Sequence, residues 1–336
     1  MPAEKTEVTE VVTGLALFGG ATPREALASP PPGFANVSPE VWARLARLER
    51  EGGFRVEFAA AWANGRALLQ ARHGLRERTP LLVEWKGGQR SPGDEVVPAD
   101  LRVDHVYMVS CKYLSKILIN ASPAHLFDRA LSGGHGVRGS DWYAEVAPDA
   151  YQALYDRVRG ELPRDLGLPP FAADLTVDHR RVLKEFSPKG RWGTSVESVY
   201  RAFAAEVARV SAARWKVALS SKRDREAMLW RLLRIGSAPY FVLGSSGDRS
   251  LRLRVATPWD WRQAFDLRRF EVWGDDAGQP VVRWRADVHD RLAGEERPVG
   301  GHVQVRWSHG RFAQPPEAKV YLDTPHHRVP GYFPLE

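Results

Sequence analysis

The spacing of apolar residues changes period along this chain, and that change constrains the fold more than any other feature. Between residues 38 and 72, apolar side chains recur every three or four positions, as in amphipathic helices. From 81 to 112 they form short runs bounded by turn-forming residues, which is typical of strands. Residues 141–236 return to the helical period, and the strand pattern resumes after Pro239. The sequence therefore predicts an α+β protein.

The first part of the chain is predicted to hold an arm followed by two helices. Residues 1–36 contain a Gly-Gly pair and a Ser-Pro-Pro-Pro-Gly run, so we expect an N-terminal arm and linker there. A helix is expected to begin at Ser38 and to end before Gly52. A second helix, over about 54–72, carries Glu57 at the edge of its apolar stripe.

Three short strands are expected next. Residues 81–86 form an apolar run that ends at a Gly-Gly pair. Residues 98–103 and 106–112 have the length and composition of a hairpin, with Asp104-His105 at its tip. A helix opened by Ser122-Pro123 should follow this hairpin.

The rest of the chain is expected to be helical and then β-rich. The predicted helices cover about 149–159, 176–186, 194–219 and 222–235. The third of them should begin with a capping box made by Thr194 and Glu197. The predicted strands cover 240–243, 251–255, 270–273, 281–286, 302–307 and 318–322.

Charge is concentrated in one part of the sequence. The 336 residues carry 48 Lys or Arg and 41 Asp or Glu, a net charge of +7. Residues 201–269 alone hold 15 Lys or Arg against 6 Asp or Glu. A basic block of this kind favours a phosphate-backbone partner. Solvated helical faces would produce the same composition, so both interpretations stay open.

Several classes of protein are disfavoured by what the sequence lacks. The single cysteine, Cys111, excludes an intrachain disulfide framework and a multi-cysteine zinc site. No apolar run has the length of a membrane helix, and acidic residues near the start argue against a secretory leader, so a cytoplasmic protein is expected. Phosphate-loop and dinucleotide-binding motifs are absent. His326-His327 is interpreted as exposed polar residues rather than a metal site.

The predicted hairpin brings together residue types that suit phosphodiester chemistry. Asp100 follows Pro98 at the start of one strand, and Ser110 and Lys112 lie two positions apart on the next. Because side chains alternate along a strand, Ser110 and Lys112 should share one face. Carboxylate oxygens are preferred ligands of Mg²⁺, and a nearby lysine can stabilise developing negative charge.

In Pro98-x-Asp100, Ser110-x-Lys112 and Glu57 on the preceding helix, the chain resembles the PD-(D/E)xK nuclease superfamily. That superfamily includes many restriction endonucleases and Holliday-junction resolvases. The resemblance extends over residues 54–131. It implies a restriction-endonuclease-like core, a small mixed sheet flanked by helices, with Mg²⁺ or Mn²⁺ held by Asp100 and Glu57. It also implies that Lys112 lies beside the attacking water.

The match departs from the superfamily pattern at one position. Ser110 stands where the superfamily usually has Glu or Asp. Either another acid substitutes for it (Glu57, Asp104 or Glu84), or the metal site is degraded. Glu84-x-Lys86 is a competing Glu-x-Lys motif, although no Pro-Asp strand precedes it. The alternative for this motif is two outward charges flanking Trp85.

Arginine and tryptophan are interleaved in the C-terminal third, a pattern that suits phosphate contact and base stacking. A half-buried strand with Trp inside and Arg outside would look the same. The candidate nucleic-acid contacts are Lys116, Arg252, Arg254, Trp259, Trp261, Arg262, Arg268, Arg269, Arg306 and Arg311.

These observations lead to four expected segments and one expected function. The segments are an arm (1–36), a nuclease-like core (37–135), a basic helical segment (136–236) and an antiparallel β-rich domain (237–336). The expected function is a Mg²⁺-dependent endodeoxyribonuclease of the restriction or phage-defence type. A homodimer is expected because two strands must be cut, and RNA stays open as a partner. The alternatives are a non-catalytic nucleic-acid-binding protein with a decayed nuclease fold and a carbohydrate-active or carbohydrate-binding protein.

Overall fold

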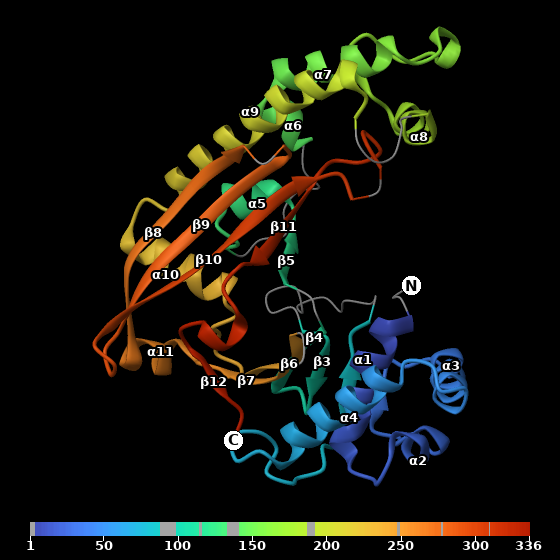
Figure 1. Ribbon diagram of the computed structural model, residues 1–336, viewed down its shortest axis with the longest axis vertical. Helices are drawn as coiled ribbons and strands as arrows, with labels where there is room; N and C mark the ends of the chain where they lie inside the picture. The colour runs from blue at the N-terminus through green and yellow to red at the C-terminus, as the bar shows by residue number, and fades with distance from the viewer. Residues whose placement is uncertain are drawn as a thin grey trace.

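The computed structural model describes residues 4–87, 99–113, 116–132, 141–186, 192–246, 249–276, 278–308 and 310–336. These residues form a mixed sheet, an antiparallel sheet and helices packed on both (Figure 1). Pro98 and His309 lie outside the described residues. No helix within the described ranges has the length and apolar content needed to cross a membrane.

The predicted alternation of helical and strand segments is present, together with elements that the sequence did not predict, among them α1, β5 and β12. The helices are α1 (Glu4–Leu15), α2 (Pro23–Ala28), α3 (Pro39–Arg50), α4 (Arg55–Gln70), α5 (Pro123–Phe127), α6 (Trp142–Val146), α7 (Pro148–Gly160), α8 (Val177–Phe186), α9 (Thr194–Ala218), α10 (Lys222–Leu232) and α11 (Pro258–Ala264). The strands are β1 (Phe34–Ala35), β2 (Val83–Trp85), β3 (Leu101–Val103), β4 (Tyr107–Tyr113), β5 (Ile117–Ala121), β6 (Tyr240–Ser246), β7 (Arg249–Val255), β8 (Phe265–Asp276), β9 (Pro280–Asp290), β10 (Glu295–Arg306), β11 (Glu317–Leu322) and β12 (Tyr332–Pro334). Short 3₁₀ helices are η1 (Ala16–Phe18), η2 (Arg164–Leu166), η3 (Ala172–Asp174) and η4 (His326–Arg328).

The mixed sheet has the strand order β1-β2-β3-β4-β6-β7-β12. β3 is antiparallel to both β2 and β4, β6 runs parallel to β4, and β7 is antiparallel to β6. α1 and α4 cover one face, where their apolar side chains pack against alternate residues of the strands (Figure 1). The sheet is therefore built from a meander of three neighbouring strands and a distant segment that crosses over to pair with it.

The β3–β4 hairpin is present where the sequence predicts it. Asp104 and His105 have φ angles of 48° and 60°, the left-handed values of a tight turn that the Val106 amide closes by donating to the Val103 carbonyl at 3.0 Å. Because Val103 pairs with Tyr107, three residues separate the strands instead of the predicted two. Asp104 Oδ1 accepts hydrogen bonds from the amides of Leu81 and Leu82 at 2.8 and 2.9 Å. The Asp104 side chain thus anchors the turn to the segment that enters β2.

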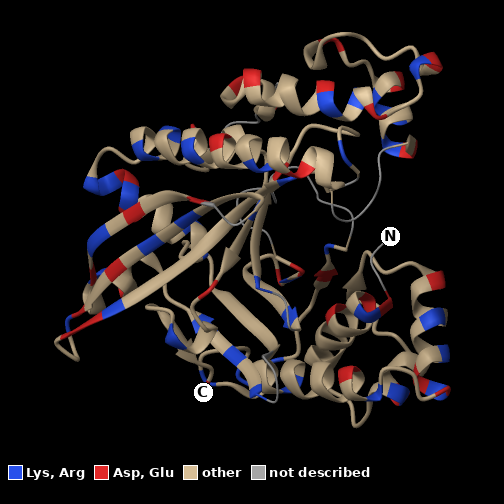
Figure 2. Ribbon diagram, turned by 45° about the horizontal axis from the view of Figure 1, so that its top comes forward, with Lys and Arg blue, Asp and Glu red and all other residues tan. Residues whose placement is uncertain are grey.

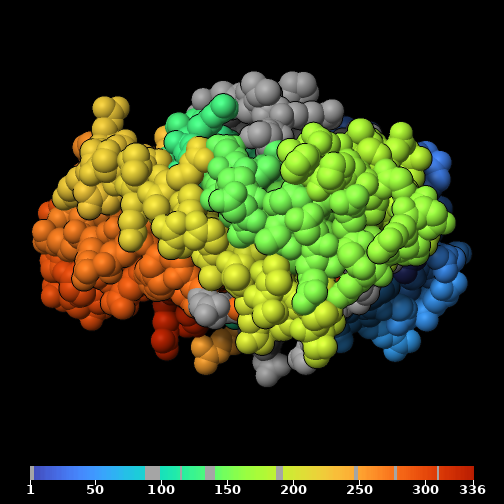
Figure 3. Space-filling model, turned by 90° about the horizontal axis from the view of Figure 1, so that it is seen from above, coloured from blue at the N-terminus to red at the C-terminus, as the bar shows by residue number. Residues whose placement is uncertain are grey.

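The antiparallel sheet has the order β5-β11-β10-β9-β8. α9 lies across β8 and β9, and the helices α5 to α7 pack around α9 (Figure 1). A Cβ at Gly274 of β8 would lie only 2.9 Å from the backbone of Ala208, so a glycine permits this close helix–sheet approach. From above, the helical segment from α6 to α9 lies between the N-terminal helices and the strands β8 to β10 (Figure 3).

The two sheets do not follow the expected division of the chain near residue 237. β6, β7 and β12 come from the last hundred residues and complete the mixed sheet. β5, from the expected nuclease core, instead pairs with β11 in the antiparallel sheet. The physical reason is that strand patterns specify which residues face a core but not which strand they pair with.

The expected N-terminal arm also differs from the structure. α1 is a regular helix with Val8, Val11, Val12 and Leu15 fully buried against the mixed sheet. Their spacing of three and four residues is the same signal that identified the later helices. At α9 the expected capping box is replaced by Gly193 at the N-cap, without a side-chain cap. The reciprocal capping box lies at α10, between Ser221 and Asp224.

Candidate active site

The backbone of the β3–β4 hairpin holds Asp100 beside the strand that carries Lys112. Asp100 immediately precedes β3, and its amide donates to the Val109 carbonyl at 2.9 Å. On its other side, the Lys86 amide donates to the Asp100 carbonyl at 2.9 Å. Lys112 lies three residues after Val109 in β4. The two residues singled out by the sequence therefore sit on neighbouring strand segments.

The Asp100 carboxylate is held in a defined position. Its Oδ2 accepts a hydrogen bond from the Cys111 amide at 2.6 Å and one from Ser110 Oγ at 3.2 Å. Within the described residues, no hydrogen bond reaches Asp100 Oδ1. Ser110, which is 4% exposed, thus orients the aspartate through its hydroxyl. The other oxygen is left available to a ligand.

A second carboxylate reaches this place from α1. Glu10 Oε2 accepts a hydrogen bond from Trp85 Nε1 of β2 at 2.7 Å. Burial raises the pKa of Glu10 to about 8, and the negative charge of Asp100 contributes to the rise. The Trp85 hydrogen bond and the positive charge of Lys112 act in the opposite direction. The charges of Asp100 and Lys112 thus act on the Glu10 carboxyl, while no hydrogen bond or ion pair of the described residues joins Glu10, Asp100 and Lys112 to one another.

Glu10 is not among the site residues predicted from the sequence. In the sequence analysis it is only one of the acidic residues near the start of the chain. A signal was present, because Glu10 directly precedes the apolar stripe residues Val11 and Val12. A carboxylate at the edge of a buried helical face needs a polar partner. The identity of that partner depends on which sheet the helix covers.

Glu57, the predicted partner of Asp100, is engaged elsewhere. It lies in the first turn of α4, and its Oε1 is 2.8 Å from Lys5 Nζ. This ion pair is the main cause of the lowered pKa of Glu57, and neither Asp100 nor Lys112 contributes to it. The described residues show no contact between Glu57 and Asp100 or Lys112. The geometry therefore gives no support to Glu57 as a shared metal ligand.

The other acids considered as substitutes for Ser110 are also bound to partners within the protein. Both oxygens of Glu84 accept from the Arg102 guanidinium, at 2.6 and 2.8 Å. Lys86 Nζ lies 3.8 Å from the same carboxylate, and both Glu84 and Lys86 are buried. The Glu84-x-Lys86 motif is thus an internal ion cluster rather than two outward charges. Asp104 serves the hairpin turn through its bonds to Leu81 and Leu82.

The donor set offered to a divalent cation is small. Among the described residues, no group of three or more His, Cys, Asp or Glu side chains is arranged to hold a metal ion. Glu10 and Asp100 are the two carboxylates in mutual electrostatic reach, with the Ser110 hydroxyl next to Asp100. Mg²⁺ prefers oxygen ligands and commonly keeps several waters when one or two carboxylates bind it. Glu10 and Asp100 are therefore the candidate holders of a hydrated divalent cation, whose charge would offset the effect of Asp100 on the Glu10 pKa.

The C-terminal segment carries a buried histidine whose pKa is affected by Lys112. His326 of η4 is 8% exposed, and burial lowers its pKa to about 4, with the charges of Lys112, His327 and Lys116 adding to the effect. His326 is therefore a buried neutral imidazole, whereas the sequence predicted an exposed polar residue. Its burial follows from the position of η4 beside β7 and β12, which no local pattern reports.

Most of the predicted nucleic-acid contacts have partners within the protein. Arg252 donates to Asn64 Oδ1 at 3.0 Å, and Trp261 is buried with its Nε1 bonded to the Pro330 carbonyl at 3.3 Å. Ion pairs join Arg254 to Asp260, Arg262 to Glu226, Arg268 to Asp266 and Arg269 to Glu271. Trp259, Lys116 and Arg306 are exposed, and Arg311 lies over the Trp192 ring. Figure 2 shows basic and acidic residues alternating along the strands of the antiparallel sheet.

Comparison of this chain with protein-family models, with curated proteins and with solved structures finds no match in any of the three.

Proposed function

We propose that this chain is a metal-dependent nuclease that hydrolyses phosphodiester bonds in DNA, with Glu10, Asp100 and Lys112 as its active residues. One observation carries the proposal: the β3–β4 hairpin orients the Asp100 carboxylate, through the Ser110 hydroxyl and the Cys111 amide, beside the strand that carries Lys112. The charge of Asp100 also raises the pKa of Glu10, which adds a second carboxylate to the proposal. Separate carboxylates and a lysine are the groups that metal-assisted hydrolysis of a phosphodiester requires.

Each residue has a distinct role in this proposal. Asp100 and Glu10 would hold Mg²⁺ or Mn²⁺, which when bound polarises the phosphate and lowers the pKa of a water. Ser110 positions Asp100 through the 3.2 Å hydrogen bond. Lys112 orients the attacking water and stabilises the negative charge that develops on the phosphate. Trp85 fixes Glu10 by its indole hydrogen bond, as second-layer donors do at metal sites.

The surrounding sheet supports the resemblance to PD-(D/E)xK nucleases. Asp100 begins one strand of the hairpin, and Ser110-x-Lys112 lies on the next. The sheet is mixed, as that resemblance implies, because β6 pairs with β4 in parallel. Helices α1 and α4 pack on one of its faces. DNA as substrate, a restriction or defence role and a homodimer that cuts both strands belong to the same proposal.

A second function has one specific observation in its favour. Asp100 Oδ2 is already bonded twice, and serine replaces the acid that the superfamily usually carries, which leaves two carboxylates as candidate metal ligands. A chain with this arrangement would suit a non-catalytic nucleic-acid-binding protein whose nuclease fold has decayed. The ion-paired arginines of the antiparallel sheet favour neither function.

Incubation with supercoiled plasmid in Mg²⁺, Mn²⁺ or EDTA tests the proposal. Wild-type protein should nick or linearise the plasmid with either metal and leave it intact in EDTA. Lys112→Ala, Asp100→Asn and Glu10→Gln should each abolish cleavage while DNA affinity stays close to wild type. Glu4→Gln, an exposed change on the same helix as Glu10, is the matched control and should cut normally. If the wild-type protein binds DNA but does not cut it with either metal, the non-catalytic binding protein is the better interpretation.

A further inference from the structure

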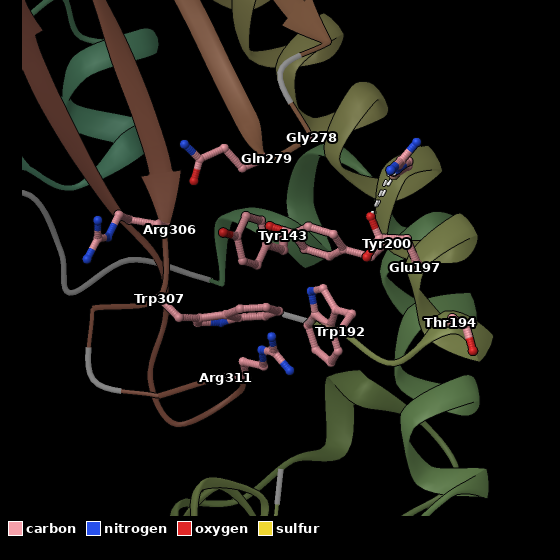
Figure 4. Close-up of a pocket in the computed structure, with 11 residues that line it drawn as sticks. Tyr143, Trp192, Thr194, Glu197, Tyr200, Gly278, Gln279, Arg306, Trp307 and Arg311 are labelled. Atoms are coloured by element: carbon pink, nitrogen blue, oxygen red, sulfur yellow. Dashed lines mark hydrogen bonds and ion pairs between the residues drawn. The ribbon is translucent and has the colours of Figure 1, made fainter. Parts of the chain in front are cut away.

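A separate cavity of about 840 Å³ opens at one end of the antiparallel sheet, in the part of the molecule that carries α9. Its volume lies in the range of small-molecule binding pockets. Figure 4 shows it between the start of α9, the end of β10 and the residues that follow β10. The lining residues that bear on a ligand are Trp192, Tyr200, Gln279, Arg306, Trp307 and Arg311.

Aromatic rings form the walls of this cavity. The ring centroids of Tyr143 and Trp307 are 4.9 Å apart, and those of Trp192 and Tyr200 are 5.2 Å apart. The fully buried Phe312 packs 4.8 Å from Trp307 and supports it from the core. Trp192, Tyr200 and Trp307 are partly exposed to this space, and the fully buried Tyr143 supports Trp307 from behind. Flat aromatic surfaces of this kind bind planar π-systems.

Positive charge is added to these walls by arginines. The guanidinium carbon of Arg311 lies 3.3 Å from the centroid of the Trp192 ring. Arg201 is neutralised by Glu197 at 3.0 Å, whereas the hydrogen bond found for the exposed Arg306 guanidinium is a 3.5 Å contact with the uncharged Gln304. The first turn of α9, a helix of 25 residues, also lines the cavity at Thr194. The N-terminal amides of this helix attract anions, as the arginines do.

We propose that this cavity binds a nucleotide, with its base against the aromatic rings and its phosphate at Arg306. A neutral sugar would leave the positive charge of the guanidinium groups unpaired, and an aliphatic anion would leave the aromatic rings without a stacking partner. A nucleotide uses both, because its base stacks and its phosphate pairs with arginine. The Gln279 amide at the same cavity supplies a donor and an acceptor for the base edge. The inference deepens the proposed function, since it assigns a DNA-processing chain a second nucleotide site away from Asp100.

Binding is measured in EDTA, so that the result does not depend on cleavage. The first probes are dAMP and dTMP, titrated against intrinsic tryptophan fluorescence, with inorganic phosphate and thymidine as the separated halves of the ligand. Trp192→Ala should weaken nucleotide binding about ten-fold or more, because stacking on one aromatic contributes of that order. Arg306→Gln should weaken it by a similar factor, because it removes the charge that pairs with the phosphate. Trp192→Phe keeps a stacking surface and should restore most of the affinity.

Two variants outside the cavity serve as matched controls. Trp273→Ala removes a half-exposed tryptophan of β8, and Arg285→Gln removes an exposed arginine that pairs with Asp287. Both should bind nucleotides as wild type does. Melting temperatures of all variants identify any loss of affinity that comes from unfolding.

A second set of probes identifies the source of the nucleotide. These are a labelled short single strand, a fully paired duplex and the same duplex with one unpaired nucleotide. Binding of free dAMP or dTMP that depends on Trp192 and Arg306 supports a mononucleotide site. Binding only of the single strand and the interrupted duplex, with the same dependence, supports a nucleotide presented within DNA. If Trp192→Ala and Arg306→Gln weaken no probe beyond the controls, the proposal is overturned.

The plasmid assay keeps this proposal distinguishable from the nuclease. If the protein binds nucleotides but never cuts plasmid, the proposed nuclease activity is wrong and the proposed nucleotide site is retained. The opposite result is plasmid cleavage that requires Glu10, Asp100 and Lys112, while the cavity variants bind every probe as the controls do. That result would support the nuclease and overturn the nucleotide site.

Discussion

Glu10 on α1 and Trp85 on β2 are joined by a 2.7 Å hydrogen bond between the indole Nε1 and the glutamate Oε2. Trp85 pairs across the sheet with Leu101, the residue after Asp100. This single bond therefore ties the helical layer to the strand segment that carries the second carboxylate. It also lowers the pKa of Glu10 against the strong effect of burial.

Removing that bond should impair the site more than the fold. In Trp85→Phe the ring packing is largely kept, but Glu10 loses its donor and its pKa rises further. We expect cleavage to fall by roughly 10- to 100-fold, as for other second-layer donors at metal sites. The free energy of unfolding should fall by about 1–3 kcal/mol, because a buried acceptor is left unpaired. Plasmid cleavage and thermal unfolding measure the two effects, and unchanged cleavage would contradict the role assigned to Trp85.

The two candidate glutamates should behave differently. Glu57→Gln breaks a partly exposed ion pair with Lys5, so cleavage should persist and stability should change by less than about 1 kcal/mol. Glu10→Gln should abolish cleavage at every metal concentration. If Glu57→Gln abolishes cleavage and Glu10→Gln does not, Glu57 is the metal ligand, as the sequence resemblance implies.

Gly244 on β6 controls the position of Lys112. A Cβ at residue 244 would lie 2.0 Å from the Lys112 carbonyl oxygen, so Gly244→Ala must push β4 and β6 apart. We expect lost cleavage and a destabilisation of about 1–3 kcal/mol, the usual cost of overpacking. Gly160→Ala, where no atom lies within 4 Å of the added methyl group, is the control. Wild-type cleavage in a folded Gly244→Ala protein would mean that Lys112 does not need this register.

Ser110→Glu would restore the acid that the PD-(D/E)xK pattern has at this position. Ser110 is buried beside Asp100, so a third carboxylate there should lower stability in EDTA by repulsion and desolvation. A divalent cation bound by these carboxylates should reverse the loss. We expect Mg²⁺ to raise the melting temperature of Ser110→Glu more than that of wild type, and cleavage to be maintained or increased. Equal Mg²⁺ effects on both proteins would place the metal elsewhere.

Stability should decline in acid because of His326. Its folded pKa of about 4 lies below the unfolded value near 6.5, so the unfolded chain binds the proton more readily. Stability is fully present above pH 6.5 and falls as the pH drops toward 4, by an amount on the order of 3 kcal/mol. His326→Gln should remove most of this slope in urea unfolding followed from pH 7 to pH 4. Lys112→Ala should weaken it, because Lys112 helps to lower the His326 pKa; a slope unaffected by either change would refute the assignment.

The sequence alone determined the elements whose patterns are local. The Asp104-His105 turn and the alternation on either side of it specify a hairpin, and the helical stripes specify α3, α4 and α7. The placement of Asp100 beside the strand of Ser110 and Lys112 follows from the same local pattern, because only the short turn over residues 104–106 separates the two strands.

Only the tertiary structure decided which distant segments surround the candidate site. Because α1 packs on the mixed sheet, Glu10 bonds to Trp85 and its pKa is raised in part by the charge of Asp100, whereas Glu57 pairs with Lys5. β6 joins β4 across more than a hundred residues, and η4 buries His326 beside Lys112. Periodicity reports which face of an element is buried but carries no information about its partner. Pairings of this kind depend on the packing of the whole chain, which no local pattern encodes.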